Sequence, residues 1–194
     1  MVQRFMRLSI PLTAAAACLG FGTAAQAATL RLGHVLPATH YIQVHLVDIF
    51  TNAVTERTNG EVTFELFPAG QVGTDIVGAM ESGLLDVGVV ISGRQPDLFP
   101  LTAVGELPQG AANACEGSSR MWQLTQAGGV LNDLEFAPNG LHVVSAHMLA
   151  PYVLYTRGVA INSLADVSGL KIWASGPAAE QAIAAIGGVP IRIP

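Results

Sequence analysis

Apolar residues recur along the chain with two alternating periods, one typical of strands and one typical of helices. Residues 29–35 form a short apolar run that predicts a strand. From Tyr41 to Thr58 apolar residues recur at helical spacing, and Asn59-Gly60 is a typical helix stop. Residues 61–67 then alternate with a period of two. This part of the chain is therefore predicted to form a strand, a helix and a second strand.

The same rhythm continues into the middle of the chain. Thr74-Asp75 are suitable residues to begin a helix that runs through Glu81. Residues 85–91 are nearly all apolar, as in a central parallel strand covered on both faces. Residues 92–110 are rich in proline and predict a loop, and residues 113–136 predict a less regular helical stretch. Strands alternating with helices indicate an open α/β sheet.

A turn at Pro138-Asn139-Gly140 separates this part from the next, which we predict to contain five further elements. Ser163 and Asp166 have the spacing of a capping box, and Pro177 suits the first turn of a helix. Because the pattern stops within its rhythm, we expect a fragment of a longer parent or a prematurely ended gene. The predicted elements are strands at 141–145, 152–156 and 170–174, a helix at 178–186 and a strand beginning at 189–193.

Residues 1–27 are typical of a secretory signal. Arg4 and Arg7 form a positive segment, an apolar segment follows, and Ala25-Gln26-Ala27 has the small-x-small pattern that predicts cleavage after Ala27. A transmembrane anchor is the alternative, although Pro11 and two glycines interrupt a stretch shorter than the ~20 apolar residues of a bilayer span. Lipid attachment at Cys18 is a further alternative. We expect an exported chain.

Composition and charge narrow the function classes. Removal of Arg4 and Arg7 changes the formal charge from −5 to −7, and the other basic residues are scattered, so we expect neither nucleic acid nor an anionic membrane surface as partner. Cys115 would then be the single cysteine, and a packed thiol is the expected role. The five histidines lack zinc-motif spacing, so we expect no metal site and no cofactor. No nucleophile elbow or phosphate-binding glycine loop is present, so we expect no enzyme.

Four sequence motifs resemble the substrate-binding subunits of tripartite ATP-independent periplasmic (TRAP) transporters of the DctP type. They cover most of the chain after the signal and follow the order of that family. The second motif is the most specific, and the third and fourth support it. The motifs are Gly33-His34-Val35-Leu36-Pro37, the run from Thr58-Asn59-Gly60 into Pro68-Ala69-Gly70-Gln71-Val72-Gly73, Ser82-Gly83-Leu84-Leu85-Asp86-Val87-Gly88 and Asp166-Val167-Ser168-Gly169-Leu170-Lys171-Ile172.

The resemblance implies an α/β periplasmic solute-binding fold with two open-sheet lobes, and an organic solute, such as an organic acid, bound between them. It also implies delivery of that solute to the small and large membrane subunits of a permease driven by an ion gradient. Residues 28–137 correspond to the first lobe and residues 138–194 to an incomplete second lobe. A solute receptor of another transport or signalling system is one alternative, and a truncated product without function is the other.

The main departure from the family is Trp173, which stands where the resemblance implies a carboxylate-binding arginine. An indole has one donor and no charge, so it does not hold a carboxylate bidentately, but it stacks on rings and covers cations. With apolar Ile91 and Tyr152 nearby in the predicted cleft, we expect a less polar or aromatic ligand. Arg157 is a candidate replacement cation, and the start of the helix beside Ser175 offers free N–H groups. Packing roles for Trp173 and a solvated charge for Arg157 remain open.

The candidate ligand-binding residues are those expected at strand ends, in loops or on crossing strands that face the cleft. Ordinary loop histidines are the alternative for the histidines in this set. The set comprises His34, His40, Ile91, Ser92, His147, Tyr152, Arg157, Trp173 and Ser175.

Overall fold

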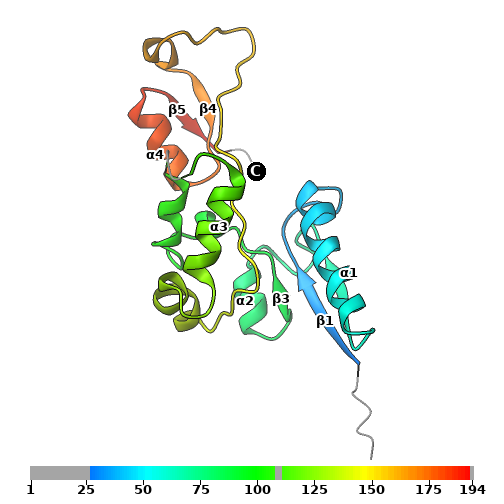
Figure 1. Cartoon of the computed structure of the whole chain (residues 1–194). Coiled ribbons are helices and arrows are strands. Elements are labelled where there is room, and N and C mark those ends of the chain that lie inside the picture. Colours follow the sequence, from blue (N-terminus) through cyan, green and yellow to red (C-terminus); the bar gives the residue numbers. More distant parts are fainter. Residues whose placement is uncertain (1–26, 108–110, 193–194) are drawn as a thin grey trace, which may run out of the picture.

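The computed structural model describes residues 27–107 and 111–192, which form two parallel sheets flanked by helices (Figure 1). The predicted signal, apart from Ala27, lies outside the described residues. The first sheet has the strand order β2-β1-β3 and the second pairs β4 with β5. These elements confirm the α/β class. Their bounds are β1 (Ala28–Gly33), α1 (Asp48–Arg57), β2 (Val62–Phe67), α2 (Ile76–Glu81), β3 (Val87–Gly88), α3 (Ala114–Thr125), β4 (Lys171–Trp173), α4 (Pro177–Ala185) and β5 (Val189–Ile191).

The first sheet forms where the sequence predicts strands. β1 pairs with β2 along its whole length, from Ala28 opposite Val62 to Gly33 opposite Phe67. A π-helical turn, η1 (Gln43–Val47), leads into α1, and α1 packs on β2 through Phe50 and Phe64, whose ring centroids are 5.8 Å apart. The helix ends at Arg57, and Asn59 and Gly60 beyond it both have positive φ, as expected of the predicted helix stop.

β3 is shorter than the predicted strand 85–91, although hydrogen bonds extend its pairing with β1. The Asp86 amide donates to the Arg31 carbonyl at 2.9 Å, and the Val89 amide donates to the Gly33 carbonyl at 3.0 Å. Leu85 is buried just before β3, where it packs with Ile76 and Ala79 of α2 in the core of this half. The chain leaves the ladder after Val89, so Val90 and Ile91 form no strand.

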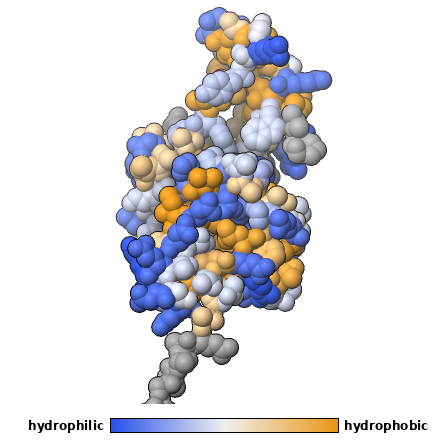
Figure 2. Space-filling view, turned by 90° about the vertical axis from the view of Figure 1, so that its right-hand side faces the viewer, coloured by the Kyte–Doolittle hydropathy of each residue, from blue (hydrophilic) through white to orange (hydrophobic). Residues whose placement is uncertain are grey.

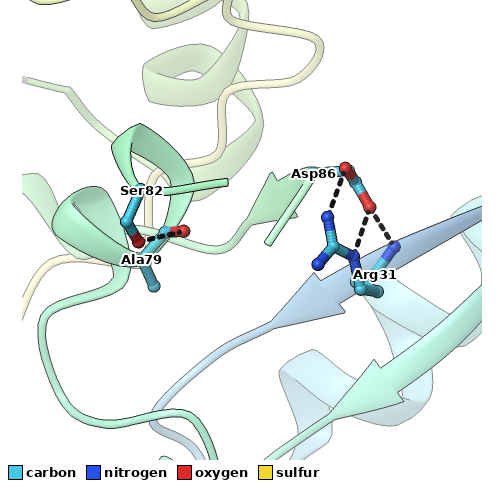
Figure 3. A network of polar contacts seen from close by, with 4 residues as sticks. All are labelled: Arg31, Ala79, Ser82 and Asp86. Carbon is cyan, nitrogen blue, oxygen red and sulfur yellow. Dashed lines mark hydrogen bonds and ion pairs between the residues drawn. The ribbon is translucent and has the colours of Figure 1, made fainter. Parts of the chain in front are cut away.

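A bidentate ion pair joins β1 to the residue just before β3 (Figure 3). The Arg31 side chain donates from Nε to Asp86 Oδ2 at 2.9 Å and from Nη2 to Oδ1 at 3.0 Å, and its backbone amide also donates to Oδ2. These hydrogen bonds hold the pKa of Asp86 below its usual range. Figure 3 also shows the end of α2, where the Ser82 hydroxyl donates to the Ala79 carbonyl. Asp86 therefore fixes the position of β3 beside β1.

Between the sheets the chain forms α3 and then further short helical turns up to Phe136, which confirms the less regular helical stretch predicted over 113–136. Asn113 caps α3 by accepting a hydrogen bond from the Glu116 amide. After α3 the chain turns at Gly128, with φ of 82°, and at Gly129, where a Cβ would lie 2.3 Å from the Leu124 carbonyl oxygen. The helical stretch is interrupted at these two glycines. A π-helical turn, η4 (Asn132–Phe136), follows and stacks Phe136 on the fully buried Phe99.

The second sheet and α4 lie where they are predicted. Ser163 and Asp166 form the predicted capping box, Pro177 occupies the first turn of α4, and β4 pairs with β5 from Lys171 opposite Val189. The predicted strands 141–145 and 152–156 were wrong. Both segments are extended but have no ladder partner among the described residues, and their chain runs along the molecule toward β4 (Figure 1).

That extended segment leaves apolar side chains in contact with solvent. Val153 is 65% exposed and Tyr155 is 92% exposed. Figure 2 shows apolar residues interleaved with charged ones over one face of the molecule. Among the described residues, no helix is both long and apolar enough to cross a bilayer.

Candidate functional site

The strand order of the first sheet creates a crevice between β1 and β3. The chain passes from β1 to β2 on one side and then crosses to β3 on the other, and open α/β sheets bind ligands at such a reversal, at the carboxyl ends of the strands. A hollow of about 290 Å³ opens there, which we call the β1–β3 hollow. It is lined by Val35, Thr74, Ile76, Val89, Val90, Ile91, Arg94 and Gln95.

The β1–β3 hollow is mainly apolar, and its polar lining residues are Thr74, Arg94 and Gln95. Arg94 ends a short 3-10 turn, η2 (Ser92–Arg94), and Gln95 follows it directly. The Gln95 Oε1 atom is buried and has no hydrogen-bond partner among the described residues. Arg94 is exposed, and its side chain forms no ion pair with the described part of the chain. The hollow therefore combines an apolar lining with an exposed cation.

A carboxylate lies close to these groups. Glu106 ends the 3-10 helix η3 (Thr102–Glu106), and its Oε1 atom would be 1.6 Å from a Cβ built on Gly93. Only glycine at position 93 therefore leaves room for this side chain. Burial raises the pKa of Glu106, and the positive charge of Arg94 partly opposes that effect.

The same turn meets the start of α4. A Cβ built on Gly176 would lie 3.1 Å from the Gly93 carbonyl oxygen and 3.6 Å from Glu106 Oε2. Ser175, partly buried, directly precedes this contact, and Ser92 is in the turn on the other side. The loops that follow β3 and β4 thus come together, as expected for strand ends that face a common cleft.

A second hollow, of about 230 Å³, lies between β4 and the extended segment before it, and we call it the Trp173 hollow. It brings Trp173 and Arg157, two of the candidate residues, together with Lys171 and Tyr155. Trp173 is 48% exposed, so its indole presents an open face. The structure thus places two aromatic rings and two cations around one depression, which shares no lining residue with the β1–β3 hollow.

The candidate histidines lie outside both sets of lining residues. His34 is 1% exposed, and its Nε2 donates to Gln43 Oε1 at 2.5 Å, while Gln43 donates in turn to Asp48. His40 accepts a hydrogen bond from the Ile42 amide through Nδ1. His147 is exposed and lies 2.6 Å from the Ser145 hydroxyl.

Two further positions complete the placement of the candidate residues. Tyr152 is 67% exposed in the extended segment and lines neither hollow. Ile91 does line the β1–β3 hollow. The described residues contain no group of three or more His, Cys, Asp or Glu side chains that is suited to a metal ion.

Sequence reasoning missed Arg94, Gln95 and Glu106. Arg94 had a detectable signal, because it follows the apolar run 85–91 by three residues and so falls at the carboxyl end of a buried strand. Glu106 had none, since its approach to Gly93 depends on the fold of the intervening loop. The charges of Arg94 and Glu106 thus lie close enough to affect each other, and neither spacing nor composition indicates that they meet.

Comparison with known proteins agrees with this architecture. Residues 32–194 match the family described as bacterial extracellular solute-binding protein, family 7. A TRAP periplasmic solute-binding protein from Bordetella bronchiseptica, solved with (R)- and (S)-mandelate, is 27% identical with a TM-score of 0.74; the match covers 86% of this chain and 52% of that one.

Two further solved structures share the fold. A TRAP solute-binding protein from Rhodoferax ferrireducens with copurified benzoate is 23% identical, with a TM-score of 0.74 and coverage of 86% and 51%. A marine metagenome TRAP protein specific for aromatic acids, with 3-hydroxybenzoate, is 22% identical, with a TM-score of 0.77 and coverage of 87% and 52%. The chain spans about half the length of these proteins. Because the family match extends over most of its length, the chain belongs to the bacterial extracellular solute-binding protein family 7, as its motifs predict.

Proposed function

We propose that this protein binds a small organic acid and delivers it to a membrane permease, and that it is not an enzyme. The observation that carries the proposal is the β1–β3 hollow, which lies at the strand ends where open α/β sheets bind ligands and which holds an arginine with free donors. A guanidinium is suited to carboxylates because its planar donors match the two carboxylate oxygens. Membership of a solute-binding family supports the same function.

The ligand class follows from the lining. Most residues around the hollow are aliphatic, so they favour a ligand with an apolar or aromatic body over a heavily hydroxylated one. The volume of about 290 Å³ lies just below the roughly 300–1,000 Å³ typical of ligand pockets, which favours a single ring. The relatives solved with benzoate, 3-hydroxybenzoate and mandelate support this class.

The remaining proposals concern location and partners. Residues 1–27 act as a signal that is cleaved after Ala27, and the mature chain works in the periplasm. Residues 28–137 and 138–194 belong to two lobes, and contact between Gly93 and Gly176 supports a cleft between them. The ligand-loaded form docks on the small and large membrane subunits of a TRAP permease. An ion gradient drives transport through that permease.

A thermal-shift screen of the purified protein tests the binding function. The panel contains benzoate, 3-hydroxybenzoate, mandelate, a dicarboxylate, an amine and a neutral sugar. We expect a melting temperature that rises with the concentration of the aromatic acids, because a ligand that binds only the folded state stabilises it by mass action. The amine and the sugar are the controls. A response to these controls alone, or to no compound, would contradict the proposal.

A further inference from the structure

Met148 fixes the middle of the extended segment, residues 141–161, to the body of the molecule. This segment contains no helix or strand and passes beside α3 on its way to β4 (Figure 1). The Met148 amide donates to the Ser118 hydroxyl at 2.9 Å, and that hydroxyl donates to the Met148 carbonyl at 3.3 Å. Among the described residues, the only other hydrogen bond from the segment to the rest of the chain is at its start, from the Leu141 amide to the Phe136 carbonyl.

Two glycines leave the space that receives the Met148 side chain, which we call the Met148 seat. A Cβ built on Gly117 of α3 would lie 3.2 Å from Met148 Cβ and 3.3 Å from its Sδ. A Cβ built on Gly105 of η3 would lie 3.6 Å from Met148 Cε and 4.0 Å from its Sδ. The thioether therefore packs between α3 and η3 at the points where both helices lack a side chain.

The Met148 seat is suited to a thioether and not to a more polar group. An oxygen added to Sδ on the side of α3 would have little room above Gly117. The donors beside the seat are already engaged, because the Gly117 amide donates to the Asn113 carbonyl and the Ser118 hydroxyl donates to the Met148 carbonyl. A sulfoxide oxygen in the seat would therefore lack a hydrogen-bond partner, which is unfavourable. Oxidation of the sulfur thus favours a position in which the segment has left α3.

Met148 is also the described methionine that becomes accessible with the least disruption of structure. Met80 lies in α2 and packs against the core of the first half, and Met121 lies inside α3. Met148 is partly exposed, and the residues on both sides of it are exposed. Segments with few backbone hydrogen bonds open locally at a low cost in free energy. A small oxidant should therefore reach the sulfur of Met148 before it reaches the two helical methionines.

We infer that Met148 is an oxidation site for hydrogen peroxide, and that its sulfoxide form detaches the extended segment from α3. A lone pair of the sulfur attacks one peroxide oxygen, so that an S–O bond forms and the O–O bond breaks. The sulfur is oxidised by two electrons and the peroxide is reduced. The departing hydroxide takes the proton of the attacked oxygen and leaves as water. This site goes beyond the proposed function, since Met148 lines neither the β1–β3 hollow nor the Trp173 hollow.

Graded treatment of the purified protein with hydrogen peroxide, followed by peptide mass spectrometry, tests the first half of the inference. The measurement gives the rates at which Met80, Met121 and Met148 each gain one oxygen atom. We expect Met148 to be oxidised first, because its segment opens most easily.

Limited digestion with trypsin tests release of the segment. Arg157 is the only arginine or lysine between Arg120 and Lys171, so cleavage after Arg157 reports on the extended segment alone. This cleavage should become about 5- to 30-fold faster after oxidation, since it follows the population of the open segment and the loss of a few contacts shifts such an equilibrium by this factor. Cleavage after Arg57, at the exposed end of α1, is the internal reference and should keep its rate.

Three variants separate the sulfur of Met148 from other effects of peroxide. Met148→Leu keeps an apolar side chain in the seat and should be cleaved slowly both before and after peroxide treatment. Met148→Gln places a polar group there and should be cleaved fast without peroxide. Met121→Leu is the matched control, because Met121 Cε also lies at Gly105, 3.0 Å from a Cβ built there. The Met121→Leu protein should respond to peroxide like the unsubstituted protein.

Several results would overturn the inference. If Met148 gains oxygen no faster than Met80 and Met121, or if Met148→Leu still responds to peroxide, Met148 is not the oxidation site. If Met148 is oxidised while cleavage after Arg157 keeps its rate, the sulfoxide stays in the seat and the segment is not released. Should Met148→Gln fail to fold, the comparison of the unsubstituted protein with Met148→Leu after peroxide treatment still decides the question.

Discussion

Replacing Glu135 with glutamine would test whether one buried carboxylate holds the loop that carries the candidate site. Glu135 is 3% exposed in η4, and its Oε2 accepts from the Thr102 amide at 2.9 Å and from the Thr102 hydroxyl at 2.5 Å. Its Oε1 accepts from the Leu101 amide. These donors open η3, the helix that ends at Glu106, so the carboxylate acts as an N-cap supplied from a distant residue.

The magnitude follows from the donors that the variant would leave without an acceptor. Glu135→Gln keeps one oxygen and places an NH₂ group against an amide or hydroxyl donor, so at least one charge-assisted hydrogen bond is lost. Such a bond contributes about 1.5–3 kcal/mol, and a buried donor without a partner adds a penalty of similar size. We expect the free energy of unfolding to fall by about 2–4 kcal/mol, a large part of the about 5–15 kcal/mol typical of a domain.

Urea unfolding followed by tryptophan fluorescence measures this change, because Trp122 lies in α3, which packs beside η4. Glu81→Gln is the control, since Glu81 is exposed and its variant should change stability by no more than about 0.5 kcal/mol. Equal unfolding midpoints for Glu135→Gln and Glu81→Gln, with equal slopes, would refute the capping role of Glu135.

Three further predictions concern stability and solubility. Asp86→Asn should destabilise the protein at neutral pH. Arg31 lowers the pKa of Asp86 in the folded state, so the carboxylate's contribution to stability is present above the ordinary pKa of Asp. That contribution is lost as the pH falls through the lowered pKa. The melting temperatures of the unsubstituted protein and Asp86→Asn should therefore converge as the pH falls from 7 to 3. A constant difference between the two melting temperatures would contradict this. Phe99→Ala, which removes a fully buried ring stacked on Phe136 at 5.1 Å, should reduce the free energy of unfolding by about 3–5 kcal/mol in urea titrations. Tyr155→Lys should reduce self-association in light scattering, because it charges the most exposed apolar position of the extended segment; unchanged scattering would show that this segment does not associate.

The elements that the sequence predicted correctly are those whose signals are local. Asp75 caps α2 by accepting from the Gly78 amide, and Asn59-Gly60 ends α1 because both residues adopt positive φ. Each signal involves residues within four positions of one another, so no tertiary contact is needed to interpret it. The capping box at Ser163 and Asp166 follows the same logic.

The elements that the sequence predicted wrongly depend on distant partners. The segments 141–145 and 152–156 alternate like strands, but a strand also requires a neighbour with free ladder groups, and none of the described strands pairs with them. The pattern of apolar and polar residues indicates the conformation that a segment prefers, but it does not indicate which surfaces come into contact.

The candidate site shows the same division between local and distant information. Ile91 lines the β1–β3 hollow, and its place at the carboxyl end of a buried strand can be identified from the apolar run, while its contact with ligand stays a prediction. Trp173 and Arg157 were predicted as separate candidates, and their meeting in one hollow depends on how the extended segment runs beside β4. Whether either contacts ligand stays a prediction.

The contact between Gly93 and Gly176 bears on how the two sheets meet. A Cβ built on Gly176 would lie 3.1 Å from the Gly93 carbonyl oxygen, so the turn after β3 and the residue before α4 touch through their backbones. Glycine at position 93 also leaves the space that the Glu106 carboxylate occupies, because a Cβ there would lie 1.6 Å from Glu106 Oε1. A side chain at either position would therefore push the turn after β3 away from its neighbours, although nothing in the local sequence indicates that these distant segments meet.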